Sequence, residues 1–252
     1  MKHPTFDKIA FEILTGTIVC ELLLMAIYWF DVLSGGQFQL LHSLFDLDGE
    51  ANIPAWFSSA QLMVVALAFW THALRQPRGL RPSKAFFGFA GCAALYGSMD
   101  EAGQIHEQVT AWMGRRYVDW LPSYAGKHFW WVMIVVAVAL GLIQLLAADL
   151  LTIWREHRRF ALFVVVGLCI GLGGAMGIET LGYKLLHGER TSLWYKAEVT
   201  LEEFMEMLGV TLILFATLKL NGALAAKRLR ASRQLWKSSR TRTPSLAGAH
   251  PQ

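Results

Sequence analysis

The sequence predicts an all-α integral membrane protein, a bundle of about six transmembrane helices with both termini cytoplasmic. Of its 252 residues, 54% are hydrophobic and 17% are charged, a composition too apolar for an ordinary soluble domain. Apolar stretches recur at about the 20-residue length that a helix needs to cross a bilayer. Basic residues are frequent in every second connection between these stretches, which is typical of a chain that crosses the membrane repeatedly.

Six apolar stretches qualify as predicted spans, and together they make one transmembrane domain over 1–220. They cover 10–31, 54–74, 85–106, 128–153, 159–184 and 197–220. The first stretch is longer than the apolar core of a signal peptide and carries Glu12 and Glu21, so we expect it to be retained as a span.

The distribution of Lys and Arg sets the predicted orientation, because cytoplasmic segments are enriched in these residues. They concentrate at the N-terminus, in the second and fourth connections and in the tail. Those before the tail include Lys2, Lys8, Arg75, Arg78, Arg81, Lys84, Arg155, Arg158 and Arg159. The first connection, between 31 and 54, has none. An even number of spans then places both termini in the cytoplasm.

The segment 221–252 is predicted to be a basic cytoplasmic tail that is partly disordered. Its first part has apolar residues among cations and is expected to extend the sixth helix along the inner surface. Its last part is rich in Ser and Thr and contains Pro244 and Pro251, which favours disorder. The lipid bilayer, with anionic lipid at the tail, is the expected partner. Nucleic acid is not, because aromatic residues do not alternate with the cations. The sequence does not indicate an oligomeric state.

Small residues point to packing rather than to chemistry. Gly167 and Gly171, then Gly173 and Gly177, have the spacing that lets membrane helices approach closely. The three cysteines fall within predicted spans and are expected to be packed thiols. No Walker loop, GxSxG elbow, HExxH or dinucleotide fingerprint is present, so whether the protein is an enzyme stays open.

Acidic residues lie in or beside the predicted spans, and they are the best indication of function. An isolated carboxylate in hydrocarbon costs at least ~2.5 kcal/mol, so such groups usually face a bundle interior, share a proton, pair with a cation or bind a metal. Topology puts the acids of the third, fifth and sixth spans at similar depth near the outer face. The candidate metal ligands are Asp100, Glu107, Glu179, Glu202 and Glu206, with His106 and Glu198 beside them.

Helical periodicity sorts these residues into two stripes that we expect to face each other. The stripe on the third span holds Asp100, Gln104 and Glu107. That on the sixth holds Glu198, Glu202, Met205, Glu206 and Gly209. Glu101, Glu203 and His106 are expected to point elsewhere.

Three functions remain open on this evidence. The leading one is an outer-face site for a divalent cation such as Ca²⁺, Mg²⁺ or Mn²⁺, with metal-dependent catalysis as an extension. The second is a proton- or cation-coupled transporter in which Glu206 and Glu21 form an inward path. The third is a structural or accessory subunit whose acids form buried ion pairs with Arg115, Arg116, Lys127 or Lys196.

Two further positions have alternative interpretations. Asp46, Asp48, Glu50 and Asn52 alternate as at the start of a calcium loop, but without the distal Glu of an EF-hand. We expect this segment to cap the second span, with Pro54 in its first turn. Glu21, near the middle of the first span, is either a functional acid or a protonated group hydrogen-bonded to Thr17 or Gln61.

Three strings carry a resemblance to a known group of proteins. LDGEANIPAWFSS, SMDEAGQIHE and LEEFMEMLG are similar to segments of uncharacterised bacterial polytopic inner-membrane proteins. This resemblance covers most of the hydrophobic part of the chain and implies the bacterial cytoplasmic membrane. It implies no activity.

Overall fold

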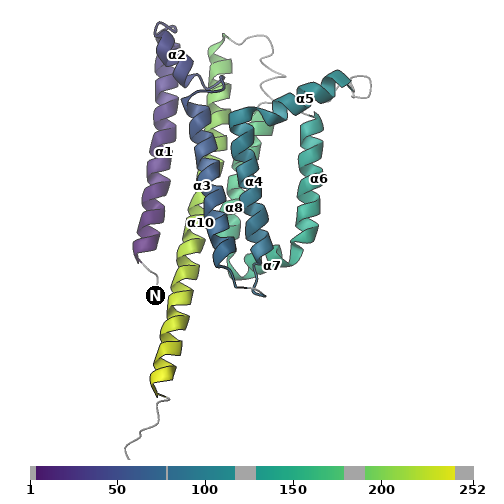
Figure 1. Ribbon diagram of the computed structural model, residues 1–252. Coiled ribbons are helices and arrows are strands. Elements are labelled where there is room, and N and C mark those ends of the chain that lie inside the picture. The colour runs from purple at the N-terminus through teal and green to yellow at the C-terminus, as the bar shows by residue number, and fades with distance from the viewer. Residues whose placement is uncertain (1–3, 78, 117–128, 179–190, 242–252) are drawn as a thin grey trace, which may run out of the picture.

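The computed structural model describes residues 4–77, 79–116, 129–178 and 191–241, and every regular element within these ranges is a helix (Figure 1). The all-α prediction is therefore confirmed for the described chain. The helices are α1 (Pro4–Leu33), α2 (Gln39–Phe45), α3 (Ile53–Arg75), α4 (Lys84–Gly103), α5 (Ile105–Arg116), α6 (Phe129–Leu145), α7 (Ala147–Glu156), α8 (Arg158–Leu172), the π-helix η2 (Gly173–Ile178) and α10 (Leu193–Thr241).

The bundle has two ends that differ in their elements (Figure 1). One end, which we call the α2 end, carries α2, α5 and the beginning of α10. The other, the α7 end, carries α7, the connection between α3 and α4, and the beginning of α1. Helix α10 runs from the α2 end past the α7 end, so both described ends of the chain lie on the same side. This agrees with an even number of crossings.

Four described stretches are long and apolar enough to cross a membrane: Asp7–Leu33, Ile53–Arg75, Arg158–Ile178 and Leu193–Leu224. A fifth is added if α6 and α7 form one broken span. The chain is therefore a membrane protein by length and composition, with four or five such helices where the sequence predicts six. Helix α4 packs along α3 but is not among the candidates, because its glycines, Tyr96, Asp100 and Glu101 dilute its apolar residues.

The fourth predicted span, 128–153, is not one straight helix. Helix α6 ends at Leu145, and α7 continues at an angle of 74°. Asp149 of α7, which is 4% exposed, explains the position of the turn. Its carboxylate accepts hydrogen bonds from the Ser83 backbone N–H at 3.0 Å, the Ser83 hydroxyl at 2.7 Å and Arg81 Nη1 at 3.3 Å. These bonds hold α7 against the connection between α3 and α4.

Glycines bring α8 and α10 into backbone contact, as predicted. A Cβ added at Gly167 would lie 2.6 Å from the carbonyl oxygen of Gly209, and a Cβ at Gly209 would lie 2.5 Å from that of Gly167. A Cβ at Gly174 would lie 2.8 Å from the carbonyl oxygen of Glu202. Gly177, in contrast, has nothing within 4 Å of an added Cβ. The close approach therefore involves part of the predicted glycine pattern.

The cysteines do not pack as predicted. Cys20, Cys92 and Cys169 are free thiols with exposed side chains. They lie on outward faces of α1, α4 and α8, because the interior faces of these helices are taken up by larger apolar groups and by the glycine contacts. No described cysteine belongs to a candidate metal group.

Two apolar clusters form the core. One contains Val65, Phe69, Phe87, Ile153 and Leu214 among its members, and it joins α3, α4, α7, α8 and α10 in the half nearer the α7 end. The other joins α1, α10 and the connection before α3, nearer the α2 end. Its buried members are Leu24, Met25, Tyr28, Leu47, Val199 and Met207. The polar side chains of interest lie between and beyond these clusters.

Helix α10 continues without a break to Thr241, so the first part of the predicted tail is helical, as expected. The remainder of the tail, 242–252, lies outside the described residues.

Candidate functional site

The predicted site residues in the described part of the chain lie at the α2 end. Asp100 lies in the last turn of α4, and His106 and Glu107 begin α5. Glu198, Glu202 and Glu206 occupy the first turns of α10. Glu179 lies outside the described residues.

A break in the third predicted span changes how its acids are arranged. Helix α4 ends at Gly103, Gln104 adopts a left-handed conformation with φ 51°, and α5 starts in a new direction. The predicted stripe of Asp100, Gln104 and Glu107 on one continuous helix is therefore wrong. The turn instead places His106 on Asp100. The His106 backbone N–H donates to Asp100 Oδ1 at 2.7 Å, and His106 Nδ1 lies 3.0 Å from Asp100 Oδ2.

The predicted stripe of α10 does not face α4. Gly174 of η2 packs on the Glu202 backbone and on Met205 and Glu206, while Gly209 packs on α8. Helix α10 contacts α8, η2, α1 and α3, and α4 packs mainly on α3. The expectation that the two stripes meet is therefore wrong, because close glycine contacts with α8 determine which side of α10 is covered.

Glu203, which was expected to point elsewhere, lies among several other carboxyls. It follows the buried residue Val199 by one turn and precedes the buried residue Met207 by one turn, which puts it on the interior face. Its side chain interacts electrostatically with Glu206, Glu101, Glu202 and Glu50. The spacing of Val199 and Met207 is the sequence signal that identifies this face.

Glu101 connects the acids of α10 to those of α4 and α5. Its carboxyl is hydrogen-bonded to Ser58 of α3 and interacts electrostatically with Glu50, Asp100 and His106. One residue further along α3, Ser59 donates a hydrogen bond to the Ser98 carbonyl at 2.8 Å, which fixes the end of α4 against α3. Sequence reasoning missed Glu203 because it followed the spacing of Glu198, Glu202 and Glu206 and not that of the buried residues Val199 and Met207. It missed Glu101 because it followed the stripe of Asp100, Gln104 and Glu107, which the turn at Gln104 breaks.

Glu50 completes the set from the connection before α3. The pKa of its carboxyl is raised, first by loss of hydration and then by the negative charges of Glu107 and Asp100, while His106 opposes the shift. Together these interactions link seven acids, which we call the α2-end acidic group. Its members are Glu50, Asp100, Glu101, Glu107, Glu202, Glu203 and Glu206.

The described residues contain no group of three or more His, Cys, Asp or Glu side chains arranged to hold a metal ion. The acids of the α2-end acidic group are thus electrostatic neighbours without forming a ready coordination shell in that part of the chain. Glu198, Glu202 and Glu206 each have polar or electrostatic partners.

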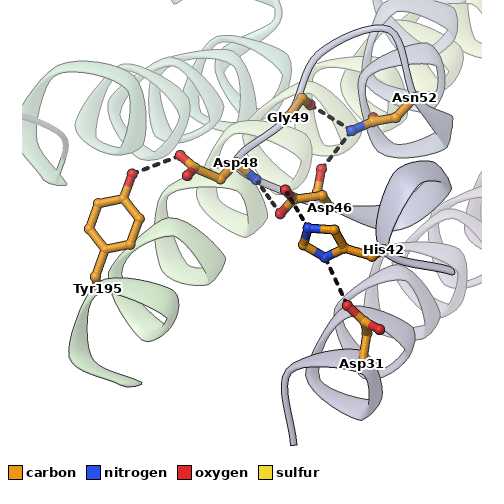
Figure 2. A network of polar contacts seen from close by, with 7 residues as sticks. All are labelled: Asp31, His42, Asp46, Asp48, Gly49, Asn52 and Tyr195. Carbon is orange, nitrogen blue, oxygen red and sulfur yellow. Dashed lines mark hydrogen bonds and ion pairs between the residues drawn. The ribbon is translucent and has the colours of Figure 1, made fainter. Parts of the chain in front are cut away.

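A separate polar network ties the elements of the α2 end to one another (Figure 2). Asp31, at the end of α1, lies with its Oδ2 3.0 Å from His42 Nδ1 of α2. His42 Nε2 lies 3.9 Å from Asp46 Oδ2. The Tyr195 hydroxyl of α10 donates to Asp48 Oδ1 at 2.8 Å. The network therefore joins α1, α2, the connection before α3, and α10.

The same connection caps α3, which confirms the predicted role of this segment. Asn52 Oδ1 accepts the Ala55 backbone N–H at 3.1 Å, and Pro54 lies in the first turn. Asn52 Nδ2 donates to the carbonyl oxygens of Asp46 and Gly49, each at 2.6 Å (Figure 2). The side chain of Asn52 is thus used for backbone contacts.

Glu21 forms a second buried polar site, in the middle of α1. Its Oε1 accepts hydrogen bonds from Gln61 Nε2 at 2.9 Å and from the Thr211 hydroxyl at 2.6 Å. The expected partner Gln61 is confirmed and Thr211 is an addition. The other expected partner, Thr17, instead donates to the Ile13 carbonyl at 2.6 Å.

Comparison with known proteins identifies a family and no activity. No curated protein and no solved structure matches the chain. Residues 16–220, which include Glu21 and the α2-end acidic group, match the family described as Domain of unknown function (DUF8692). The chain therefore belongs to the DUF8692 family.

Proposed function

We propose that the protein binds a cation at the α2-end acidic group, in the outer leaflet of a bacterial cytoplasmic membrane. The observation that carries this proposal is the environment of Glu203, whose carboxyl interacts with four other carboxyls from α4, α10 and the connection before α3.

Electrostatics gives the physical reason. Two like charges about 4 Å apart near a protein surface repel by about 4 kcal/mol. Several mutually close carboxylates cannot all be ionised unless protons or a metal ion supply positive charge. His106 supplies part of that charge when it is protonated, through its contact with Asp100. The remaining acids favour the uptake of a cation.

A divalent ion with a preference for oxygen ligands fits this donor set best. Carboxylates are the usual ligands of Ca²⁺, Mg²⁺ and Mn²⁺. Because no three described acids are already arranged around one point, we propose that carboxyls share protons in the metal-free protein and release them when an ion binds. Glu179 and Glu198, predicted from the sequence, remain candidates for additional ligands.

Thermal unfolding of the purified full chain tests this proposal. An ion that binds the folded state alone stabilises it by about 2.7 kcal/mol at about 100 times its dissociation constant. We expect Ca²⁺, Mg²⁺ or Mn²⁺ to raise the melting temperature and a chelator to reverse the gain. Glu202→Gln and Asp100→Asn should abolish the gain. Glu12→Gln, which alters an exposed ion pair with Lys8 in the N-terminal half of α1, should retain it.

A melting curve that ignores chelator and all of these ions would contradict the metal proposal. Shared protons or buried ion pairs would then account for the acids, and the protein would be a structural or accessory subunit.

The orientation that this function needs places the α2 end outside and both termini in the cytoplasm. Its support is the concentration of Lys and Arg in the α3–α4 connection, around α7 and in the tail, where these residues favour anionic lipid. Single cysteines at Ser34 and Ser192 should react with an impermeant reagent from outside, and one at Ser232 only after permeabilisation. A cysteine-free background is needed, because the three native cysteines are exposed. External labelling at Ser232 would reverse the orientation.

Proton- or cation-coupled transport is the second candidate function. One observation favours it: Glu21 is 0% exposed and lies deeper in the same bundle as the α2-end acidic group.

A further inference from the structure

We propose that Glu21, Gln61 and Thr211 form an occluded proton-binding site inside the membrane, at which Glu21 takes up and releases one proton. This site is separate from the α2-end acidic group, and the inference does not depend on metal binding there.

Position within the bundle is the first support. In the span Asp7–Leu33, Glu21 lies about 21 Å from one end and about 18 Å from the other, by the rise of a helix. Glu21 is 0% exposed, Thr211 is 1% exposed and Gln61 is 5% exposed. An ionised carboxyl at such a position is costly, so these residues need a functional or structural reason to be there.

The hydrogen bonds define an oriented site. The Thr211 hydroxyl donates to Glu21 Oε1 at 2.6 Å, and Gln61 Nε2 lies 2.9 Å from both Glu21 Oε1 and Thr211 Oγ1. Because the Thr211 proton points to Glu21, its oxygen is free to accept from Gln61. One donor from α3 and one from α10 thus point to the same carboxyl oxygen of α1.

The other carboxyl oxygen is available for a proton. Glu21 Oε2 and Gln61 Oε1 are buried acceptors with no hydrogen-bond partner among the described residues. A buried acceptor without a hydrogen-bond partner destabilises the folded protein. A proton on Oε2 removes the charge and converts one of the two acceptors into a donor. Glu21 makes no ion pair with a described residue that would serve instead.

Apolar residues close the site on both sides. Toward the α2 end, Met207 is 0% exposed and lies one turn before Thr211, and Leu24 and Met25 lie about one turn after Glu21. Toward the α7 end, Val65 lies one turn after Gln61, in the other apolar cluster. The site is therefore isolated from water at rest, and exchange requires an opening.

The α2-end acidic group is positioned to supply protons to Glu21. Glu203 and Thr211 lie on one face of α10, two turns and about 12 Å apart, with Met207 between them. A displacement of the Met207 side chain would connect the two sites. This arrangement suits stepwise proton transfer and makes Met207 the barrier.

Infrared spectroscopy of the full chain in liposomes tests the proposal. We expect a carbonyl band of a protonated carboxylic acid that is absent in Glu21→Gln and weakens as the pH rises. Thr211→Val should shift the band, Thr211→Ser should restore it, and Glu12→Gln should leave it unchanged.

Labelling with a hydrophobic carbodiimide provides a measurement on the wild-type chain, in case Glu21→Gln does not fold. The reagent adds to a protonated carboxyl in an apolar setting, and mass spectrometry locates the adduct. We expect labelling at Glu21 that falls as the pH rises and is insensitive to Na⁺. A pH-independent band with pH-independent labelling would show a permanent structural hydrogen bond and overturn the proposal. Protection by Na⁺ at constant pH would overturn it in favour of a sodium site. Neither result depends on whether metal binds at the α2 end.

Discussion

Buried carboxylates at the two ends of the bundle have opposite surroundings. At the α7 end, Asp149 is met by donors, the backbone and hydroxyl of Ser83 and the guanidinium of Arg81. At the α2 end, Glu203 is met by other carboxyls. The first arrangement satisfies a negative charge within the protein, whereas the second requires positive charge from elsewhere. The difference separates an acid that holds the fold from the acids at which we propose that a cation binds.

The largest expected effect comes from removing the acid of the α7 end. Asp149→Ala leaves the Ser83 N–H, the Ser83 hydroxyl and Arg81 without their acceptor. We expect it to lower the free energy of unfolding by about 3 kcal/mol, since bonds to charged groups are each worth roughly 1.5–3 kcal/mol. Denaturant unfolding in detergent measures the loss, and Asp149→Asn should recover part of it. Wild-type stability in Asp149→Ala would remove the structural half of the comparison.

Contact between α8 and α10 supports the α2-end acidic group, so disturbing it should weaken both stability and any metal response. A Cβ at Gly209 would lie 2.5 Å from the Gly167 carbonyl oxygen and 2.7 Å from the Gly171 nitrogen. We expect Gly209→Ala to cost about 1–3 kcal/mol, the usual cost of overpacking. Gly177→Ala is the matched control, because its added Cβ meets nothing within 4 Å. Equal melting temperatures for the two variants would disprove the close packing.

The cap of α3 is expected to have an intermediate effect. Asn52→Ala removes the acceptor for the Ala55 N–H and the donor to two carbonyl oxygens in the connection that carries Glu50. We expect a loss of about 1 kcal/mol, typical of a helix N-cap. Asn52→Asp keeps the acceptor but replaces the donor with an oxygen that faces the carbonyl oxygens of Asp46 and Gly49, so it should lose at least as much. Thermal unfolding of the three proteins side by side measures this order, and it fails if Asn52→Asp is as stable as the wild type.

The smallest effect should have the opposite sign. Because the pKa of Glu50 is raised in the folded protein, its ionisation opposes folding. In chelator, Glu50→Gln should match the wild type below the ordinary carboxyl pKa of 4.5 and become relatively more stable as the pH rises through the raised value. Melting temperatures across this pH range provide the measurement. A variant that loses stability with rising pH relative to wild type would contradict the crowding of carboxyls at the α2 end.

The sequence was sufficient for the helical class, the apolar stretches, the cap at Asn52 and the glycine contact, because each depends on local pattern or composition. It was insufficient for the breaks at Gln104 and Leu146. A left-handed Gln carries no strong local signal, and the turn before α7 depends on Asp149 reaching Ser83, far away in sequence. Glu203, Glu101 and Glu50, which the sequence did not single out as candidate ligands, lie in the α2-end acidic group beside Glu202 and Glu206.

Direct titration of metal into chelator-treated protein tests the central claim, that the α2-end acidic group binds a cation. Bound ion and released protons are measured together in a weakly buffered solution. We predict saturable binding of Ca²⁺, Mg²⁺ or Mn²⁺ with proton release, lost in Glu203→Gln and retained in Glu12→Gln. Wild-type protein that binds none of these ions, or a Glu203→Gln variant that binds them as the wild type does, would contradict the account.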